Sequence, residues 1–275
     1  MLTAKTLVAI TGSTKYEDRM ASFAERLNTY APSQTAPHRL AQLLPQVLHE
    51  SMAFRYVREI WGPTSAQLRY EGRADLGNVQ VGDGKRFMGR DLIQCTGRSN
   101  YRALTEWVHA NLDPDAPDFE ETPELLEQPE WLGIAVIWYW ATRVSASYVE
   151  AGNIEMITRQ INGGLNGYTD RLQWFDKSAL VLLGYGRDHV RAFQSAAGID
   201  VDGVSGPKTR AAMHEALMAL DGVPAADLQP DPSDDDTDAL RALLGEIGSD
   251  LSGLQSTNDA VREKLETAIS LVDGD

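Results

Sequence analysis

Apolar residues recur at helical spacing through much of the chain. Between His38 and Glu50 they stand three and four positions apart, which predicts an amphipathic helix with one buried face. The apolar positions of this helix are Leu40, Leu43, Leu44, Val47 and Leu48. The same spacing predicts further helices within residues 1–35, 102–150, 153–161 and 171–183. The pattern therefore predicts a mainly helical fold of the all-α class.

Residues 62–101 depart from this pattern. Glycine is dense there and long periodic runs are absent, which predicts loops with short strands around Lys85–Ile93. We expect a minor short-strand region in an otherwise helical fold. Glycine lets backbone approach a ligand closely, but the phosphate-binding patterns GxxxxGK[ST] and GxGxxG are both absent from the segment.

Glu50 and Glu59 stand in an apolar and aromatic stretch, nine positions apart. On a continuous helix this spacing amounts to half a turn net and a rise of roughly 13 Å, so the two side chains would point in opposite directions. If they act together, the chain must bend near Ser51–Tyr56. Two carboxylates in unequal environments at one cleft are what glycoside hydrolysis requires. On this stretch alone, two surface glutamates remain the favoured interpretation.

The net charge of −15 is concentrated in one segment. Residues 221–275 carry 14 acidic and 3 basic residues, so the rest of the chain is nearly balanced. The absence of a basic stripe argues against nucleic acid as a partner. No apolar run reaches the length of a membrane span, and the N-terminal residues show no signal-peptide pattern. We therefore expect synthesis in the cytoplasm and no membrane insertion.

Several kinds of catalytic site are excluded by motif. Cys95 is the single cysteine, which excludes an internal disulfide and a cysteine-rich zinc site. His49-Glu50 does not continue as HExxH, because Ala53 stands where the second histidine is needed. No serine lies in a GxSxG nucleophile elbow.

Three separated motifs resemble glycoside hydrolase family 19, which contains plant-type chitinases and bacteriophage endolysins. They are HES at His49–Ser51 with Glu59 beyond it, GRADLGN…GDGKRFMGRDLIQCTGRSNY at Gly72–Tyr101, and INGGLNG followed by an arginine at Ile161–Arg171. The resemblance covers residues 5 to 180 in order and spacing. It implies a helical, two-lobed, lysozyme-like fold, an inverting mechanism, and no metal or organic cofactor.

The resemblance also implies roles for individual residues. Glu50 matches the general acid, Glu59 the general base, and Thr96 the residue that helps to hold the attacking water. Positions that bind substrate or line the cleft are matched by His49, Gln94, Asn100, Asn162 and Arg171. One departure is Asp91, where the family commonly has glycine, and we expect it to alter the substrate-side loop.

Residues 186–220 resemble the short helical peptidoglycan-binding module found beside many cell-wall hydrolases. The match lies in VRAFQ, DGVSGPKT and TRAAMHEAL. The usual first helix of the module is missing or merged with the helix before it. The alternative is a helical hairpin that only packs on the catalytic domain.

Residues 221–237 are acidic and are predicted to form a flexible linker. Residues 238–275 then repeat apolar positions in fours and threes, with Asn258 at a seam position, which predicts an amphipathic helix. We expect self-association through residues 238–272, with packing on the body or a partner as the alternative. The expected domains are thus 1–185, 186–220, 221–237 and 238–275.

These observations predict an endolysin or muramidase that cleaves β-1,4 bonds in the glycan strands of bacterial peptidoglycan. It would be made in a host cytoplasm and act on the cell wall. Two alternatives stay open. The first is a chitinase with the same chemistry on a polymer of GlcNAc. The second is a non-catalytic wall-binding or virion structural protein that has kept the fold.

Overall fold

The computed structural model describes residues 1–223. The α-helices in this part of the chain are α1 (Ala4–Thr11), α2 (Glu17–Tyr30), α3 (Pro37–Glu50), α4 (Ser65–Leu68), α5 (Asp83–Arg86), α6 (Arg98–Asn111), α7 (Ile134–Arg143), α8 (Ala146–Glu150), α9 (Ile154–Asn162), α10 (Tyr168–Leu182), α11 (Val190–Ala196) and α12 (Pro207–Met218). Short 3-10 helices cover η1 (Pro32–Thr35), η2 (Ala74–Leu76) and η3 (Pro123–Glu127). This confirms the predicted all-α class.

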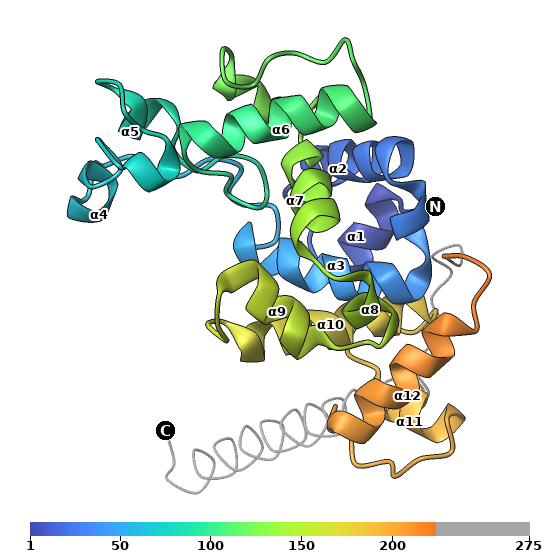
Figure 1. Cartoon of the computed structure of the whole chain (residues 1–275). Helices are drawn as coiled ribbons and strands as arrows, with labels where there is room; N and C mark the ends of the chain where they lie inside the picture. The colour runs from blue at the N-terminus through green and yellow to red at the C-terminus, as the bar shows by residue number, and fades with distance from the viewer. Residues whose placement is uncertain (224–275) are drawn as a thin grey trace, which may run out of the picture. The chain divides into compact units, whose positions relative to one another are not determined.

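Helix α3 is the central element of the core. Its apolar face is fully buried, as the spacing of its leucines predicts, and the helix packs along α10 and against α8, α9 and α12 (Figure 1). The helix continues through Pro45 to Glu50. Helix α7 is buried against α2 and α6, as expected for an element that is apolar nearly all round. The core therefore fixes the end of α3, where Glu50 stands.

The prediction of short strands around Lys85–Ile93 is wrong. Lys85 lies in α5, and residues 1–223 contain only isolated bridges, between Arg58 and Arg90 and between Arg90 and Cys95. Asp91 and Gln94 have φ angles of 62° and 55°. Such left-handed backbone cannot continue a strand, so the chain turns after a single bridge.

None of the helices among residues 1–223 is long and apolar enough to cross a bilayer. The predicted linker at 221–237 lies almost wholly outside the described residues. The predicted helix at 238–275 and the self-association through 238–272 lie entirely outside them.

Candidate active site

The chain bends sharply after α3, where the sequence requires a bend if Glu50 and Glu59 are to act together. Met52, Ala53 and Phe54 have φ angles of 51°, 53° and 66°. The hydroxyl of Ser51 donates to the carbonyl of Val47 at 2.7 Å and accepts from the amide of Phe54 at 2.9 Å. Left-handed backbone at residues other than glycine costs about 1 kcal/mol or more each. The surrounding contacts must therefore hold this turn.

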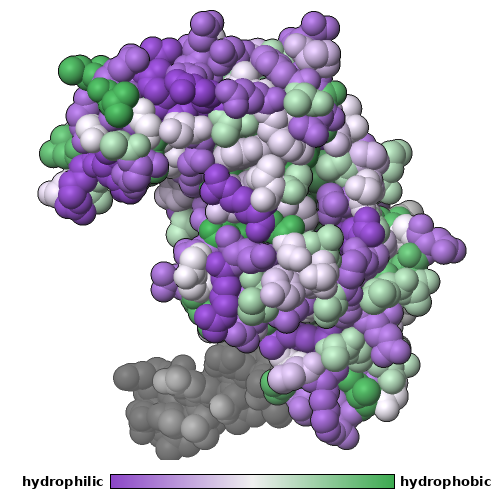
Figure 2. All heavy atoms as spheres, in the orientation of Figure 1, coloured by the Kyte–Doolittle hydropathy of each residue, from purple (hydrophilic) through white to green (hydrophobic). Residues whose placement is uncertain are grey.

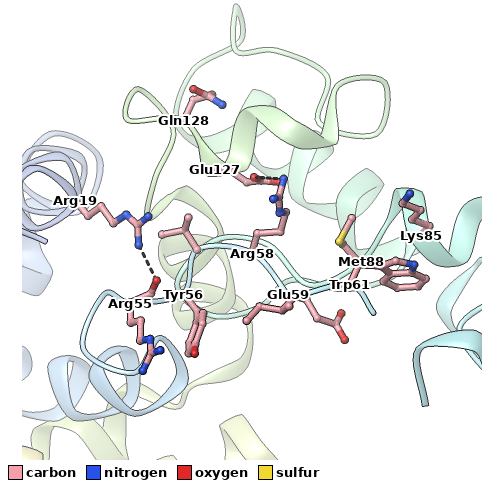
Figure 3. Close-up of a pocket in the computed structure, with 12 residues that line it drawn as sticks. Arg19, Arg55, Tyr56, Arg58, Glu59, Trp61, Lys85, Met88, Glu127 and Gln128 are labelled. Carbon is pink, nitrogen blue, oxygen red and sulfur yellow. Dashed lines mark hydrogen bonds and ion pairs between the residues drawn. The ribbon is translucent and has the colours of Figure 1, made fainter. Parts of the chain in front are cut away.

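Two contacts of that kind are visible. The Phe54 side chain is fully buried, with its ring centroid 5.7 Å from that of Phe23. Arg19 Nη1 donates to the carbonyl oxygens of Phe54 and Arg55, both at 2.8 Å, and Figure 3 shows the second of these bonds. Arg19 comes from α2 and gives no sequence signal for this role, because the contact spans 35 residues.

The carboxylate of Glu59 is held at both oxygens. Gln67 Nε2 donates to Oε1 at 3.0 Å, and the backbone N–H of Gly89 donates to Oε2 at 3.1 Å. The N–H of Glu59 donates in turn to the carbonyl of Gly89 at 2.8 Å. Tyr70 is close by, and burial followed by the neighbouring Glu59 carboxylate raises the pKa of Tyr70. Its hydroxyl therefore stays protonated beside the carboxylate.

Gln67 is a buried residue that the sequence did not single out. Its Oε1 accepts from the amides of Gly62 at 3.1 Å and Thr64 at 2.7 Å, and its Nε2 also donates to the carbonyl of Ile60 at 2.8 Å. It forms a capping box with Thr64 at the start of α4. Because Oε1 can only accept, the amide orientation is fixed and the N–H groups must face Glu59 and Ile60.

Gln94 and Thr96 meet Glu59 at Gly89. A Cβ atom built on Gly89 would lie 2.8 Å from Gln94 Oε1 and 3.3 Å from Thr96 Oγ1, so both side chains lie against the glycine backbone. The Thr96 hydroxyl donates to the carbonyl of Gln94 at 2.9 Å. Gly89 thus brings together the carboxylate, the hydroxyl and the amide that the sequence motifs single out.

Asn100 on α6 holds the backbone at Thr96 in place. Its Nδ2 donates to the carbonyl of Thr96 at 2.7 Å, and its Oδ1 accepts from Arg143 Nη2 at 2.9 Å. Both ends of the amide are therefore bonded to protein, and Asn100 supports the loop.

Glu50 is anchored from α10. Its Oε1 accepts from Arg171 Nη2 at 2.5 Å, and Arg171 Nη1 donates to Gln46 Oε1 at 2.5 Å. The Arg171 side chain is 1% exposed, whereas that of Glu50 is 26% exposed. Within residues 1–223 the other oxygen, Oε2, accepts no hydrogen bond from the protein. A rigid cation thus fixes one oxygen of the carboxylate and leaves the other available.

His49 and Asn162 lie near this anchor. His49 Nδ1 lies 2.7 Å from Asp170 Oδ2, and its ring packs on Gly167, where an added Cβ would come within 2.2 Å of it. Asn162 ends α9, and its Nδ2 donates to the carbonyl of Asn166 at 3.1 Å. Both residues brace the segment between α9 and α10.

A cleft of about 660 Å³ opens beside the Glu59 segment. Arg19, Tyr56, Arg58, Glu59, Trp61 and Met88 are among its lining residues, and Glu50 is not. Figure 3 shows Arg58 turned to Glu127 while Glu59 points to the other side of the segment. The arginines beside Glu59 in sequence therefore do not pair with it. Figure 2 shows the surface hollowed between the α4–α5 segment and α9.

Asp91 does not face the cleft. Its side chain is fully buried and accepts from the amides of Leu92 at 2.6 Å, Gly133 at 2.8 Å and Ala135 at 2.8 Å. Burial raises the pKa of Asp91 to about 6, and these N–H donors oppose that rise. Asp91 ties the Gln94–Thr96 loop to the N-terminus of α7, which is a structural reason for an acidic residue here.

A second cavity, of about 750 Å³, lies on the loop between α11 and α12 and is lined by Asp200, Asp202, Lys208 and their neighbours. The buried Gln194 organises this loop. Its Nε2 donates to Asp202 Oδ1 at 2.7 Å, and its Oε1 accepts from the amide of Gly203 at 2.8 Å. No group of three or more histidine, cysteine, aspartate or glutamate side chains among residues 1–223 could hold a metal ion.

Comparisons with known proteins match two parts of the chain. Residues 187–213 match the family described as "Putative peptidoglycan binding domain". A glycosyl hydrolase family 19 domain-containing protein from Haemophilus influenzae is 34% identical over 106 residues, which is 38% of this chain and 48% of that protein. This chain thus spans about half the length of that relative. The predicted resemblances to family 19 and to a peptidoglycan-binding module are confirmed, whereas the phage origin stays a prediction.

Two solved structures share a weaker likeness. Chitinase C from Streptomyces griseus has a TM-score of 0.48 at 16% identity, over 65% of this chain and 90% of that one. A bacterial family 19 chitinase has a TM-score of 0.48 at 17% identity, over 64% of this chain and 92% of that one. Likeness at this level supports no inference about the site.

Proposed function

We propose that this protein is a glycoside hydrolase that cleaves β-1,4 bonds in peptidoglycan by inversion, with Glu50 as general acid and Glu59 as general base. The observation that carries the proposal is the cluster at Gly89. There a carboxylate held by two N–H donors lies beside the Thr96 hydroxyl and the Gln94 amide, next to an open cleft. The similarity to a family 19 protein and to a peptidoglycan-binding family supports it.

The proposed chemistry assigns one role to each carboxyl group. The acid, Glu50, gives its proton to the oxygen of the leaving sugar, and Glu59 takes a proton from the water that attacks the anomeric carbon on the opposite face. Glu50 Oε2 is the oxygen left without a protein partner, so it is the one available to the glycosidic oxygen. The Thr96 hydroxyl and the Gln94 amide would orient the water.

Arg171 is assigned differently from the family pattern. It is almost wholly buried and bonded to Glu50 and Gln46. In this proposal it positions the acid and does not contact sugar. Asn100, with both ends of its amide bonded to protein, likewise supports the Thr96 loop.

The α11–α12 segment would supply the second contact with the wall. Its loop cavity carries backbone and carboxylate groups from Asp200 and Asp202 beside Lys208. An enzyme that binds the polymer next to its active site acts repeatedly on an insoluble substrate, because each release leaves it near another bond. We propose an endolysin-type role, with synthesis in a host cytoplasm and action on the cell wall.

Chitin is the second candidate substrate. Both polymers present N-acetylated sugars in β-1,4 linkage, and the relative's family 19 domain is compatible with either. The peptidoglycan-binding match at residues 187–213 favours peptidoglycan.

The test is digestion of purified peptidoglycan and of chitin oligomers, with mass spectrometry of the fragments and NMR of the anomer first released. Glu50→Gln should reduce the rate by about 10²–10⁴-fold, and the exposed Glu130→Gln should not. Wall fragments with an inverted anomer and an inactive Glu50→Gln support the proposal. Equal cleavage by Glu50→Gln would show that Glu50 is not the general acid. Cleavage of chitin oligomers without cleavage of peptidoglycan would show that chitin is the substrate.

A further inference from the structure

A third cavity lies apart from the catalytic cleft and shares no lining residue with it. Its volume is about 250 Å³, and it lies between α2, η1, α6 and α7. Tyr30, Trp107 and Trp140 are its aromatic lining residues, and Ala31, Leu112 and Ala141 are its solvent-accessible apolar ones. We call this cavity the tryptophan pocket. Neither the family motifs nor the peptidoglycan-binding match covers it.

The pocket carries one unused hydrogen-bond donor, from Gln34. The indole Nε1 of Trp140 donates to Gln34 Oε1 at 3.2 Å. An indole N–H can only donate, so the oxygen of the Gln34 amide must be the atom that faces it. The NH₂ group is then the free end, and it has no acceptor among residues 1–223.

The pocket also carries one unused acceptor, from Asn111. Its Nδ2 donates to the carbonyl of Trp107 at 2.8 Å. A backbone carbonyl can only accept, so the NH₂ group of Asn111 is fixed there. Its Oδ1 has no donor among residues 1–223. A donor and an acceptor of fixed identity thus stand beside an apolar, aromatic cavity.

A secondary amide with a methyl group complements this arrangement. Its carbonyl would accept from the Gln34 NH₂, its N–H would donate to Asn111 Oδ1, and its methyl group would lie against Ala31, Leu112 or Ala141. The volume lies below the roughly 300–1,000 Å³ of pockets for drug-sized ligands, so it has room for about one ring. The apolar C–H face of a pyranose can pack on an aromatic wall.

We propose that the tryptophan pocket binds one N-acetylhexosamine unit through its acetamido group, as an accessory site separate from the Glu59 cleft. This goes beyond the proposed function and does not depend on it, because binding of a single sugar involves no bond cleavage. An N-acetylated peptide offers the same amide chemistry without the pyranose ring, so the test must separate the two sources.

The experiment is an NMR titration of the full chain that follows the tryptophan indole N–H signals. Trp107→Phe and Trp140→Phe assign the pocket signals, and the signal of Trp61 reports the Glu59 cleft separately. The probes are GlcNAc, glucose, and N-acetylalanine methylamide. We expect GlcNAc to shift the Trp107 and Trp140 signals with a Kd of about 1–10 mM, which is typical of a few weak contacts. We expect glucose to leave these signals unchanged and the acetylated peptide, which lacks the pyranose ring, to shift them only at higher concentration than GlcNAc.

Gln34→Glu is the matched variant, because it keeps the acceptor for Trp140 and removes the donor. It should weaken GlcNAc binding at least about tenfold, since an amide carbonyl would then face a carboxylate. Gln160→Glu is the control, because it makes the same change outside the pocket, where Gln160 Oε1 accepts from the amide of Ser145. This variant should bind GlcNAc as the wild type does. If Gln34→Glu unfolds the pocket, Asn111→Ala, at an exposed position, replaces it.

Three results would overturn the proposal. Glucose that binds as well as GlcNAc would show that the acetamido group is not recognised. Equal binding of the acetylated peptide would make the pocket an amide site without sugar preference. Pocket signals that do not move up to about 50 mM GlcNAc, well above the expected range, would show that the pocket binds no such sugar.

Discussion

At the scale of single residues, Gly89 is the point where the candidate site comes together. Its N–H holds Glu59, and its Cα faces Gln94 and Thr96. Gly89→Ala places a methyl group 2.8 Å from Gln94 Oε1, at the far end of a flexible side chain that can swing away if its Nε2 gives up the 3.0 Å bond to the carbonyl of Asp91. We expect activity on peptidoglycan to fall, by up to about 100-fold, because a displacement of about 1 Å at a reacting group can cost that much.

The same substitution should lower the free energy of unfolding by no more than about 1 kcal/mol, since no backbone has to move and one side-chain hydrogen bond is lost. Gly222→Ala is the control, at a glycine with open space around its Cα. Steady-state kinetics and thermal unfolding of both variants make the comparison. Full activity in Gly89→Ala would mean that the position of Gln94 does not matter for the reaction.

Asp91 gives a second residue-scale prediction, on pH. Its pKa is raised to about 6 in the folded protein, against about 3.9 in an unfolded chain. Between these values the folded state binds more protons, so the free energy of unfolding should fall as pH rises from about 4 to about 6. The contribution is about 3 kcal/mol, fully present below pH 4 and lost above pH 6.

Asp91→Asn cannot titrate and should lack this contribution. The measurement is the difference in the free energy of unfolding between wild type and Asp91→Asn, by urea titration at several pH values from 4 to 7. Asp115→Asn, at an exposed aspartate, is the control that shows the effect of a surface carboxylate. A difference that does not change with pH would show that Asp91 ionises as readily folded as unfolded.

At the scale of elements, the short helix α4 matters because its capping box holds Glu59. Gln67 bonds the loop amides with one end and Glu59 with the other, whereas Thr64 only caps the helix. Gln67→Ala should lower kcat about 10–100-fold with little change in KM, because it frees the carboxylate that we propose as the general base. It should also destabilise the fold by about 1–3 kcal/mol, the cost of leaving buried polar groups unpaired.

Thr64→Ala separates the two effects. It removes the cap, at a cost of about 1 kcal/mol, and leaves the bond from Gln67 to Glu59 in place. We expect lower stability with nearly normal kcat. If both variants lose kcat equally, activity depends on α4 being folded. The bond from Gln67 to Glu59 would then have no separate effect on kcat.

The sequence predicted elements better than contacts, for a physical reason. Apolar spacing is a local property, so it located α3, α9 and α10 to within a few residues. A bend after α3 was predicted on the condition that Glu50 and Glu59 act together, because nine residues of continuous helix would point them in opposite directions. The prediction of strands failed because residues with left-handed backbone, such as Asp91, end a strand. The amino-acid composition of the segment does not reveal that backbone conformation.

Several contacts that shape the site act across the chain. Arg19 bonds the turn 35 residues away, and Asp91 bonds α7 from 42 residues away. Gly89 matters because its N–H bonds Glu59 and because Gln94 and Thr96 pack against it. None of these contacts leaves a periodic trace in the sequence, whereas Glu50, Glu59 and Thr96 were predicted as site residues through family motifs that carry such long-range information.

At the scale of the whole molecule, the α11–α12 segment is packed on the rest of the fold. Arg210 on α12 makes two bonds of 2.8 Å to the carboxylate of Asp176 on α10, and His214 Nε2 lies 2.9 Å from the carbonyl oxygen of Glu150. Residues 1–223 all belong to one compact unit. We therefore expect this segment and the helices around α3 to unfold together.

Arg210→Ala tests that coupling. Burial raises the pKa of Asp176 even beside the guanidinium, so removal of Arg210 leaves a poorly solvated carboxyl group. Arg210→Ala should lower the free energy of unfolding by up to about 3 kcal/mol. This is the lower end of the range for breaking a buried ion pair, because both side chains keep some solvent contact. Calorimetry of the full chain should show the main unfolding transition at lower temperature, and Asp176→Ala in the same chain should recover part of the loss.

Arg159→Ala is the matched control, because it breaks an exposed pair with Glu155 on one helix. Such pairs contribute less than about 1 kcal/mol, so its transition should stay close to that of the wild type. If Arg210→Ala shifts only a small separate transition, α11–α12 unfolds independently. The proposed wall-binding segment would then be a flexible attachment to the rest of the fold. A single shifted transition instead means that the Asp176–Arg210 contact holds this segment and the proposed catalytic site in one cooperative unit.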